Sequence, residues 1–198
     1  GHVPQPVNLF DTEFVWNYEA GLKAAFLERA LRMGVTGFYS DYTNLQQTLF
    51  RINPQTAVRY PRVENAASAA IKGVELDLEA IPYRGLRLRA SATWLDAQFG
   101  RFTSIDPIYP ERGEQDLTGN RLPQAPEWQF GVSSEYSLPI SSTLEVTARA
   151  DYKWQNEIYF DLFNNPLNTQ GTYGLLNASV AIGTIDESWS LSAVVRNA

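Results

Sequence analysis

The chain has 198 residues, which is enough for one domain with a sizeable core or for part of a larger one. A formal charge of −6 argues against a nucleic-acid partner held through its phosphates, and the absence of cysteine excludes disulfides and thiolate metal sites. No stretch approaches the ~18 consecutive apolar residues of a membrane helix. A membrane β-strand, however, is only half apolar, so this composition leaves a membrane β-barrel open.

Alternation of apolar and polar residues with period two is the dominant pattern and predicts an all-β fold. In the segment 72–94, for example, Val74, Leu76 and Leu78 alternate with acidic residues. Eight strands are predicted on this basis, all longer than the usual ~5–6 residues. They cover 14–27, 30–50, 66–81, 86–102, 127–138, 143–160, 172–183 and 188–197.

The predicted connections differ in length in a regular way. Short turns are expected at 28–29, 82–85, 139–142 and 184–187, whereas 52–65 and 103–125 are long and 161–171 is intermediate. Antiparallel strands joined in this way have their short turns at one end and their long loops at the other. This layout is typical of an outer-membrane barrel with tight periplasmic turns and extended external loops.

Aromatic residues gather toward the ends of the apolar rows, as in the girdles that mark the levels of the lipid headgroups. They are Trp94, Trp128, Trp154, Trp189, Tyr18, Tyr39 and Tyr152. In this interpretation, the apolar row of each strand meets lipid and the charged row faces an aqueous or protein-filled lumen.

The charged rows are therefore expected on the lumen wall. An acidic row and a basic row flank the 82–85 turn and should form a ladder of opposite charges, provided that an odd number of turn residues keeps both on one face. A site for catalysis or for a hard cation is the less favoured reading of these carboxylates. The predicted lumen-facing charges are Glu75, Asp77, Glu79, Arg87, Arg89, Glu145, Arg149 and Asp151.

Signs of enzymatic chemistry are sparse. The one histidine of the chain is His2, so a Ser-His-Asp relay cannot be built. No phosphate-binding glycine loop is visible, and no catalytic residue, metal site or cofactor is expected.

The long segment 103–125 is the more informative candidate, because a loop of this length usually binds something or is disordered. Tyr109, Arg112, Asn120 and Arg121 suit an anionic or hydroxylated ligand. The alternative is a solvated loop whose prolines set its path.

Several strings resemble TonB-dependent outer-membrane receptors. They include "VWNYEAGLKAAFLERALRMGVTGFYSDYTNLQ" (15–46), "NAASAAIKGVELDLEAIPYRGLRLRASATWLDAQF" (65–99), "LTGNRLPQAPEWQFGVSSEYSLP" (117–139) and "YGLLNASVAIGTIDESWSLSAVVRNA" (173–198). The combination of I-K-G-V-E-L with N-R-L-P-x-A-P-E-W carries most of the resemblance.

The resemblance implies a 22-stranded barrel in the cell outer membrane, an internal plug domain and a TonB box coupled to the proton motive force. Such receptors take up scarce ligands, most often ferric siderophores, with cobalamin, haem and glycans as other cases. The chain shows no plug and no TonB box and stops at "VVRNA". Residues 1–198 are therefore expected to be part of such a barrel, with lipid, the missing plug, TonB and a ferric siderophore as partners.

Two other classes remain open. A complete eight-stranded outer-membrane barrel would act as an anchor or adhesion protein, since eight strands can close around a filled interior. A secreted, carbohydrate-binding β-sandwich would have a polar solvent face and no aromatic girdles.

Overall fold

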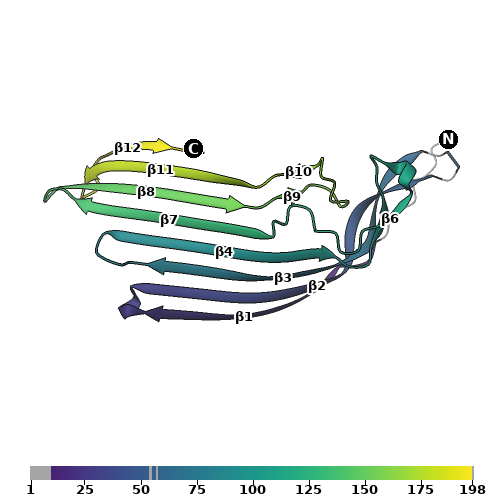
Figure 1. Ribbon diagram of the computed structural model, residues 1–198, viewed down its shortest axis with the longest axis horizontal. Helices are drawn as coiled ribbons and strands as arrows, with labels where there is room; N and C mark the ends of the chain where they lie inside the picture. Colours follow the sequence, from purple (N-terminus) through teal and green to yellow (C-terminus); the bar gives the residue numbers. More distant parts are fainter. Residues whose placement is uncertain (1–9, 54, 57, 198) are drawn as a thin grey trace.

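The computed structural model describes residues 10–53, 55–56 and 58–197 and contains one large antiparallel sheet (Figure 1). Its eight strands follow one another in chain order, as the alternation predicts. The strands are β1 (Phe14–Phe26), β2 (Leu31–Ile52), β3 (Arg59–Ala80), β4 (Leu86–Phe99), β7 (Trp128–Pro139), β8 (Leu144–Gln155), β11 (Tyr173–Thr184) and β12 (Ser190–Val195). Four further short strands, β5, β6, β9 and β10, lie in the connections.

The short turns all lie at one end of the strands, here called the turn end. They consist of residues 27–30, 81–85, 140–143 and 185–189. The first of these turns contains the short 3₁₀ helix η1 (Leu27–Arg29). In the second, Gly85 has φ +87°, and a Cβ there would lie 2.3 Å from the carbonyl oxygen of Ser137. Only glycine fits this turn without strain.

The opposite end of the strands, here called the loop end, consists of residues 53, 55–56, 58, 100–127 and 156–172 among those described. It contains two small hairpins and the 3₁₀ helix η2 (Pro110–Arg112). One hairpin joins β5 (Thr103–Ile105) to β6 (Glu114–Asp116), and the other joins β9 (Ile158–Tyr159) to β10 (Thr169–Gln170). The alternation of short and long connections is confirmed for 100–127 and 156–172.

The prediction of a long loop at 52–65 is wrong. β3 begins at Arg59, and β2 and β3 continue past their neighbours as a two-stranded ribbon that curves away at the loop end (Figure 1). The predicted ends of β4 at 102 and of β8 at 160 are also too late, since these strands end at Phe99 and Gln155.

The ribbon bends at an irregularity in its pairing. The register shifts between Tyr42 and Gln46, and Asn44 adopts a left-handed conformation with φ 57°. Asn65 supports the bend from the opposite strand, because its Nδ2 donates to the carbonyl oxygen of Asn44 at 2.7 Å. A bulge of this kind increases local twist and redirects the strand.

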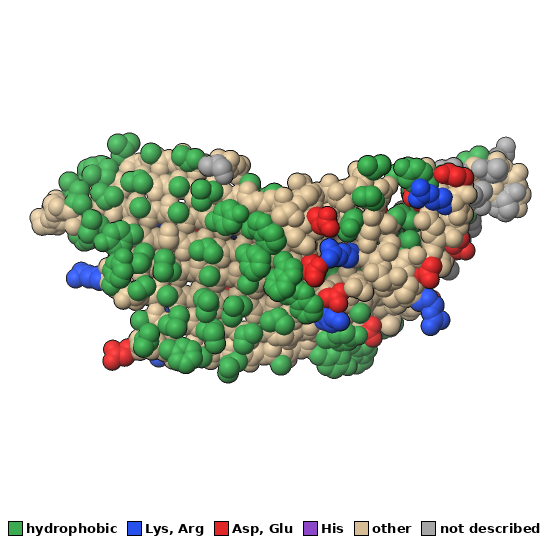
Figure 2. Space-filling model, viewed as in Figure 1, with side chains coloured by type: hydrophobic (Ala, Val, Ile, Leu, Met, Phe, Trp, Pro, Cys, Tyr) green, Lys and Arg blue, Asp and Glu red, His purple; other side chains and the backbone are tan. Residues whose placement is uncertain are grey.

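The pairing register gives the sheet two chemically different faces. On one face, here called the apolar face, Leu22 lies opposite Val35 and Ala90 lies opposite Val132. Leu22 and Val132 remain 62% and 55% exposed, so no second layer covers them among the described residues. Figure 2 shows this face, where hydrophobic side chains extend from the turn end to a zone of charged residues. This single layer contradicts the β-sandwich.

The other face, here called the polar face, is concave. A hollow of about 770 Å³ lies over it, with Lys23, Arg32, Asp77, Ser133 and Asp151 among its lining side chains. Within the described residues, β1 pairs with β2 alone and β12 with β11 alone, so the sheet is open and the eight-stranded closed barrel is not formed.

The buried core lies at the loop end rather than along the sheet. Leu49 from the ribbon meets Phe99, Phe102 and Leu117, and the rings of Phe99 and Phe102 are 5.0 Å apart. This core fixes the segment 100–127 against the ribbon. Across the described residues, the structure has no helix of the length and apolarity that a membrane crossing requires.

Candidate functional site

Aromatic side chains form a row across β4, β7 and β8 on the apolar face. The ring centroids of Trp94 and Trp128 are 6.5 Å apart, Trp128 and Phe130 are 5.7 Å apart, and Phe130 and Trp154 are 5.3 Å apart. Beyond this row toward the loop end, Lys72 and Asp96 form an ion pair at 3.1 Å. The row therefore marks a boundary between apolar and charged surface.

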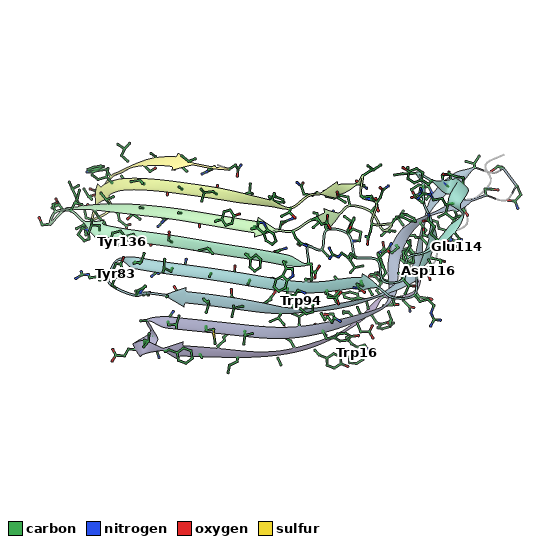
Figure 3. All side chains as sticks on the ribbon, viewed as in Figure 1. Trp16, Tyr83, Trp94, Glu114, Asp116 and Tyr136 are labelled. Carbon is green, nitrogen blue, oxygen red and sulfur yellow. The ribbon has the colours of Figure 1, made fainter. Side chains whose placement is uncertain are left out.

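A second aromatic pair lies near the turn end. Tyr83 and Tyr136 meet edge to face with their centroids 6.1 Å apart. Figure 3 shows this pair at one end of the sheet and Trp94 and Trp16 much farther along it. The apolar face is thus bounded by aromatic side chains at both levels, as expected for a band that contacts lipid.

Glu79 is the centre of the charge cluster on the polar face. One of its carboxylate oxygens lies 3.6 Å from both Arg87 Nε and Arg89 Nη2, and the other lies 3.4 Å from Arg32 Nη1. Glu79 and Arg89 are paired across β3 and β4, so both charged rows share one face as predicted. The turn that joins the strands covers residues 81–85, an odd number.

The predicted ladder is nevertheless shorter than the sequence suggests. Glu75 lies between Thr36 and Thr93, and Asp77 lies between Gly34 and Ser91. Neither carboxylate forms an ion pair with another described residue. The last arginine of β4 is Arg89, so the basic row lies opposite Glu79 but does not extend to Asp77 or Glu75.

The second group of predicted charges is also divided. Arg149 Nε donates toward Glu135 Oε2 at 2.7 Å, and the two residues are paired across β7 and β8. Asp151 instead lies between Ser133 and Asn177, and Glu145 accepts a 3.4 Å hydrogen bond from the Thr147 hydroxyl. Sequence reasoning missed Glu135 as the acidic partner of Arg149.

Asn120 and Arg121, two of the predicted ligand contacts, hold the two long connections together. Asn120 Nδ2 donates to the carbonyl oxygen of Leu162 at 2.9 Å, and the backbone N–H of Arg121 donates to Asn164 Oδ1 at 2.7 Å. The Arg121 guanidinium is paired with Glu127. These contacts give both residues a role in positioning the loops.

Tyr109 and Arg112, the other two predicted contacts, line a hollow of about 350 Å³ between the segments 100–127 and 156–172. The Arg112 guanidinium carbon lies 4.3 Å from the centre of the Tyr109 ring, a cation–π contact. Gln115 and Asp106 also line this hollow. Sequence reasoning missed both, because no local pattern shows which residues of a loop point inward.

An ion pair between Arg51 and Glu64 joins the two strands of the ribbon near its tip. The Arg51 guanidinium donates to both carboxylate oxygens of Glu64, at 3.1 and 2.5 Å. This hydrogen bond, aided by the positive charge, lowers the pKa of Glu64 below its ordinary value, against the opposing effect of burial. The same bond raises the pKa of Arg51.

Asp116 in β6 shows a similar local effect without a charged partner. The Thr118 hydroxyl and the Thr118 backbone N–H both donate to Asp116 Oδ1, at 2.6 and 2.9 Å, and lower the pKa of Asp116. No cluster of three or more His, Cys, Asp or Glu residues with metal-binding geometry exists in the part of the chain that the structure describes. His2 lies outside the described residues.

The protein-family comparison matches residues 2–198 to the model described as "TonB dependent receptor-like, beta-barrel". Among solved structures, the ferric yersiniabactin uptake receptor FyuA from Yersinia pestis is similar with a TM-score of 0.70 and 22% identity. The match covers 93% of this chain and 24% of FyuA.

Two further structures show the same fold. The siderophore receptor PiuA from Acinetobacter baumannii matches with a TM-score of 0.68 and 19% identity, over 92% of this chain and 24% of PiuA. The FrpB iron transporter from Neisseria meningitidis matches with a TM-score of 0.60 and 15% identity, over 93% of this chain and 27% of FrpB. The chain thus spans about a quarter of the length of these proteins. Together with the two-faced antiparallel sheet, the family match shows that this chain belongs to the β-barrel family of the TonB-dependent receptors.

Proposed function

We propose that this chain forms part of the barrel wall of a longer outer-membrane receptor that takes up a ferric siderophore with energy supplied through TonB. The observation that carries the proposal is the open, two-faced sheet of the TonB-dependent receptor barrel, with an apolar face between aromatic rows and a concave polar face. A soluble protein would rarely expose an apolar surface of this extent.

The aromatic rows support the placement in the membrane. In β4, nine residues run from Leu86, which is paired with Tyr136, to Trp94 in the other aromatic row, close to the ~9–11 residues with which a tilted strand crosses the hydrocarbon. The short turns would lie on the periplasmic side and the loop end outside the cell, which is the usual arrangement in outer-membrane barrels.

The polar face supports a role for a plug domain as partner. Glu75, Asp77 and Asp151 point toward the concave side without a described cationic partner, so a plug surface that carries arginine or lysine would complement them. Glu79 and Arg149, in contrast, already have partners within the sheet. The barrel wall would thereby fix the position of the plug.

Siderophore uptake is supported by the names of the structural relatives, which are receptors and transporters for iron or its chelates. The loop end adds a hollow with an available guanidinium, which suits the anionic groups that many ferric chelates carry. The receptor has no catalytic role in this proposal, since it moves its ligand unchanged.

The test is uptake of ⁵⁵Fe by the bacterium that carries the gene, compared with a strain from which the gene is deleted. We expect the deletion to abolish uptake of one ferric siderophore from a panel of catecholate, hydroxamate and carboxylate chelates. A plasmid copy of the gene should restore uptake, and a protonophore should stop it.

The deletion strain must take up other ferric chelates at the normal rate, which controls for general damage to the envelope. Unchanged uptake of every chelate, together with loss of cobalamin, haem or glycan uptake, would move the proposal to that ligand. Unchanged uptake of all of these compounds would overturn the transport function.

A further inference from the structure

Two side chains with hydrogen-bond donors line the hollow at the loop end, Gln115 with a buried amide nitrogen and Arg112 exposed to solvent. Gln115 Nε2 is shielded from solvent and has no hydrogen-bond partner among the described residues. The Arg112 guanidinium has the Tyr109 ring against one of its faces, and no carboxylate of a described residue lies within ion-pair distance of it. Both side chains line the same hollow of about 350 Å³.

A buried donor without an acceptor is unfavourable, because it has lost its water and gained nothing in return. Stacking on Tyr109 leaves the edge of the Arg112 guanidinium available, and that edge carries the N–H groups that match a carboxylate in two parallel hydrogen bonds. An oxygen-bearing group in the hollow would replace water on the exposed Arg112 guanidinium, and a rotation of the Gln115 side chain would let the same group accept from the buried amide.

The charged residues that line the hollow indicate which kind of ligand group it would bind. Asp106 also lines it, is 4% exposed, and accepts a hydrogen bond from the backbone N–H of Ile108 at 2.8 Å. The lining therefore combines one guanidinium with one carboxylate. This balance disfavours a multiply charged phosphate and favours a group with a single negative charge.

We propose that this hollow is a binding site for a carboxylate group, held by Arg112 and Gln115. Resting on the proposed function, the site would recognise a free carboxylate on the transported ferric chelate. Phe163 and Leu167 from the facing segment close the hollow and would contact the carbon atoms next to the carboxylate.

The site is built before any ligand arrives. Reciprocal hydrogen bonds between Arg121 and Asn164, at 2.7 and 3.0 Å, join the segment that carries Arg112 to the segment that carries Phe163. The buried core of Leu49, Phe99 and Phe102 fixes the first segment to the ribbon. Preorganisation of this kind reduces the ordering that binding would otherwise require.

The experiment uses the intact receptor, purified in detergent, with ¹³C-acetate and then citrate as probes. Saturation-transfer NMR should detect acetate on the wild-type protein. Arg112→Gln should weaken binding about tenfold or more, the effect expected from the loss of a charge-assisted hydrogen bond. Gln115→Leu should weaken binding by a smaller factor, because it removes a neutral donor.

Arg101→Gln is the matched control, since Arg101 is an exposed arginine near the same loops and does not line the hollow. It should bind acetate as the wild type does. Absence of acetate binding in the wild type, or equal binding in Arg112→Gln, would overturn the site even if a siderophore is transported. Acetate binding that depends on Arg112, in a receptor that transports no ferric chelate, would uphold the site and refute the proposed function.

Discussion

Arg121 and Asn164 exchange two hydrogen bonds across the two long connections. The backbone N–H of Arg121 donates to Asn164 Oδ1 at 2.7 Å, and Asn164 Nδ2 donates to the carbonyl oxygen of Arg121 at 3.0 Å. Asn164 has φ 51°, a left-handed conformation that asparagine tolerates better than most residues. One side chain thus satisfies both backbone groups of a residue 43 positions away.

Asn164→Ala should separate the two connections. It removes both hydrogen bonds, each worth about 0.5–1.5 kcal/mol, and adds strain at a positive φ. Amide hydrogen exchange in 100–127 and 156–172 should accelerate roughly tenfold or more, while the strands keep their protection. Asn165→Ala is the control, because the Asn165 side chain accepts only from the backbone of Leu167 in its own segment. Unchanged protection in Asn164→Ala would show that the core alone holds the loops.

Ala90 and Ser91 are neighbours in β4 on opposite faces, so arginine at each position tests the assignment of the faces. Ala90 lies midway between the pairs Leu86–Tyr136 and Trp94–Trp128, so Ala90→Arg should destabilise the folded protein in a bilayer by about 2–4 kcal/mol, the effect of a charge near the middle of the lipid band. Ser91→Arg should have little effect, since Asp77 lies opposite on the polar face. Urea-dependent folding into phospholipid vesicles measures both, and equal destabilisation would contradict the assignment.

Glu79→Gln should leave Arg32, Arg87 and Arg89 without their shared counter-charge. The arginines are partly exposed, and pairs of this kind contribute about 0–1 kcal/mol each, so a loss of about 1–2 kcal/mol in unfolding free energy is expected. The difference from wild type should shrink at high salt. Glu145→Gln serves as the control, because Glu145 bonds only to a hydroxyl, and should show no salt-dependent loss.

The ribbon tip should loosen in acid. Because the folded-state pKa of Glu64 lies below its ordinary value near 4.5, the Arg51–Glu64 pair stabilises the ribbon fully above that pH. The contribution is lost as the pH falls through the lowered pKa of the folded state. Limited proteolysis of the ribbon should therefore increase below about pH 4.5 in the wild type. Glu64→Gln should cleave faster at neutral pH and show less of this acid response. A wild-type response equal to that of the variant would refute the role of the pair.

Gln115→Leu should stabilise the loop end and at the same time weaken acetate binding. Replacing a buried donor that has no partner with an apolar side chain of similar size removes its desolvation penalty, which is about 1–3 kcal/mol for such groups. The loop end should therefore open less readily in hydrogen exchange, although acetate binding weakens. A loss of protection instead would mean that the Gln115 amide already has a structural partner, such as an ordered water molecule.

The regular part of the sheet could be predicted from the sequence because a sheet with one apolar and one polar face requires strict alternation. Leu76, Glu75 and their neighbours follow this rule from Val74 to Ala80 in β3. The ribbon could not be found in this way. The pairing of β3 with β4 ends at Ala69, so Pro61 lies where β3 is paired as a strand with β2, and it is tolerated there although it suggests a loop in the sequence.

The candidate site was only half predictable for a related reason. Arg112 and Asn120 are polar residues of one loop, and sequence alone gives them the same role. The structure gives them different roles because of the segment 156–172. This segment presents the carbonyl of Leu162 to Asn120 and leaves Arg112 beside a hollow. Such tertiary contacts between loops have no period that a sequence pattern could reveal.

The position of the buried core at the loop end has a consequence for how such a receptor can diversify. The apolar face of the sheet is left exposed among the described residues, whereas Leu49, Ala67, Phe99, Phe102 and Leu117 bury one another at the loop end. None of these five core residues is among the exposed large hydrophobic side chains. Under the proposed function, substitutions that reshape the loop end would therefore leave the lipid-facing surface unchanged, and ligand preference would evolve separately from the barrel wall.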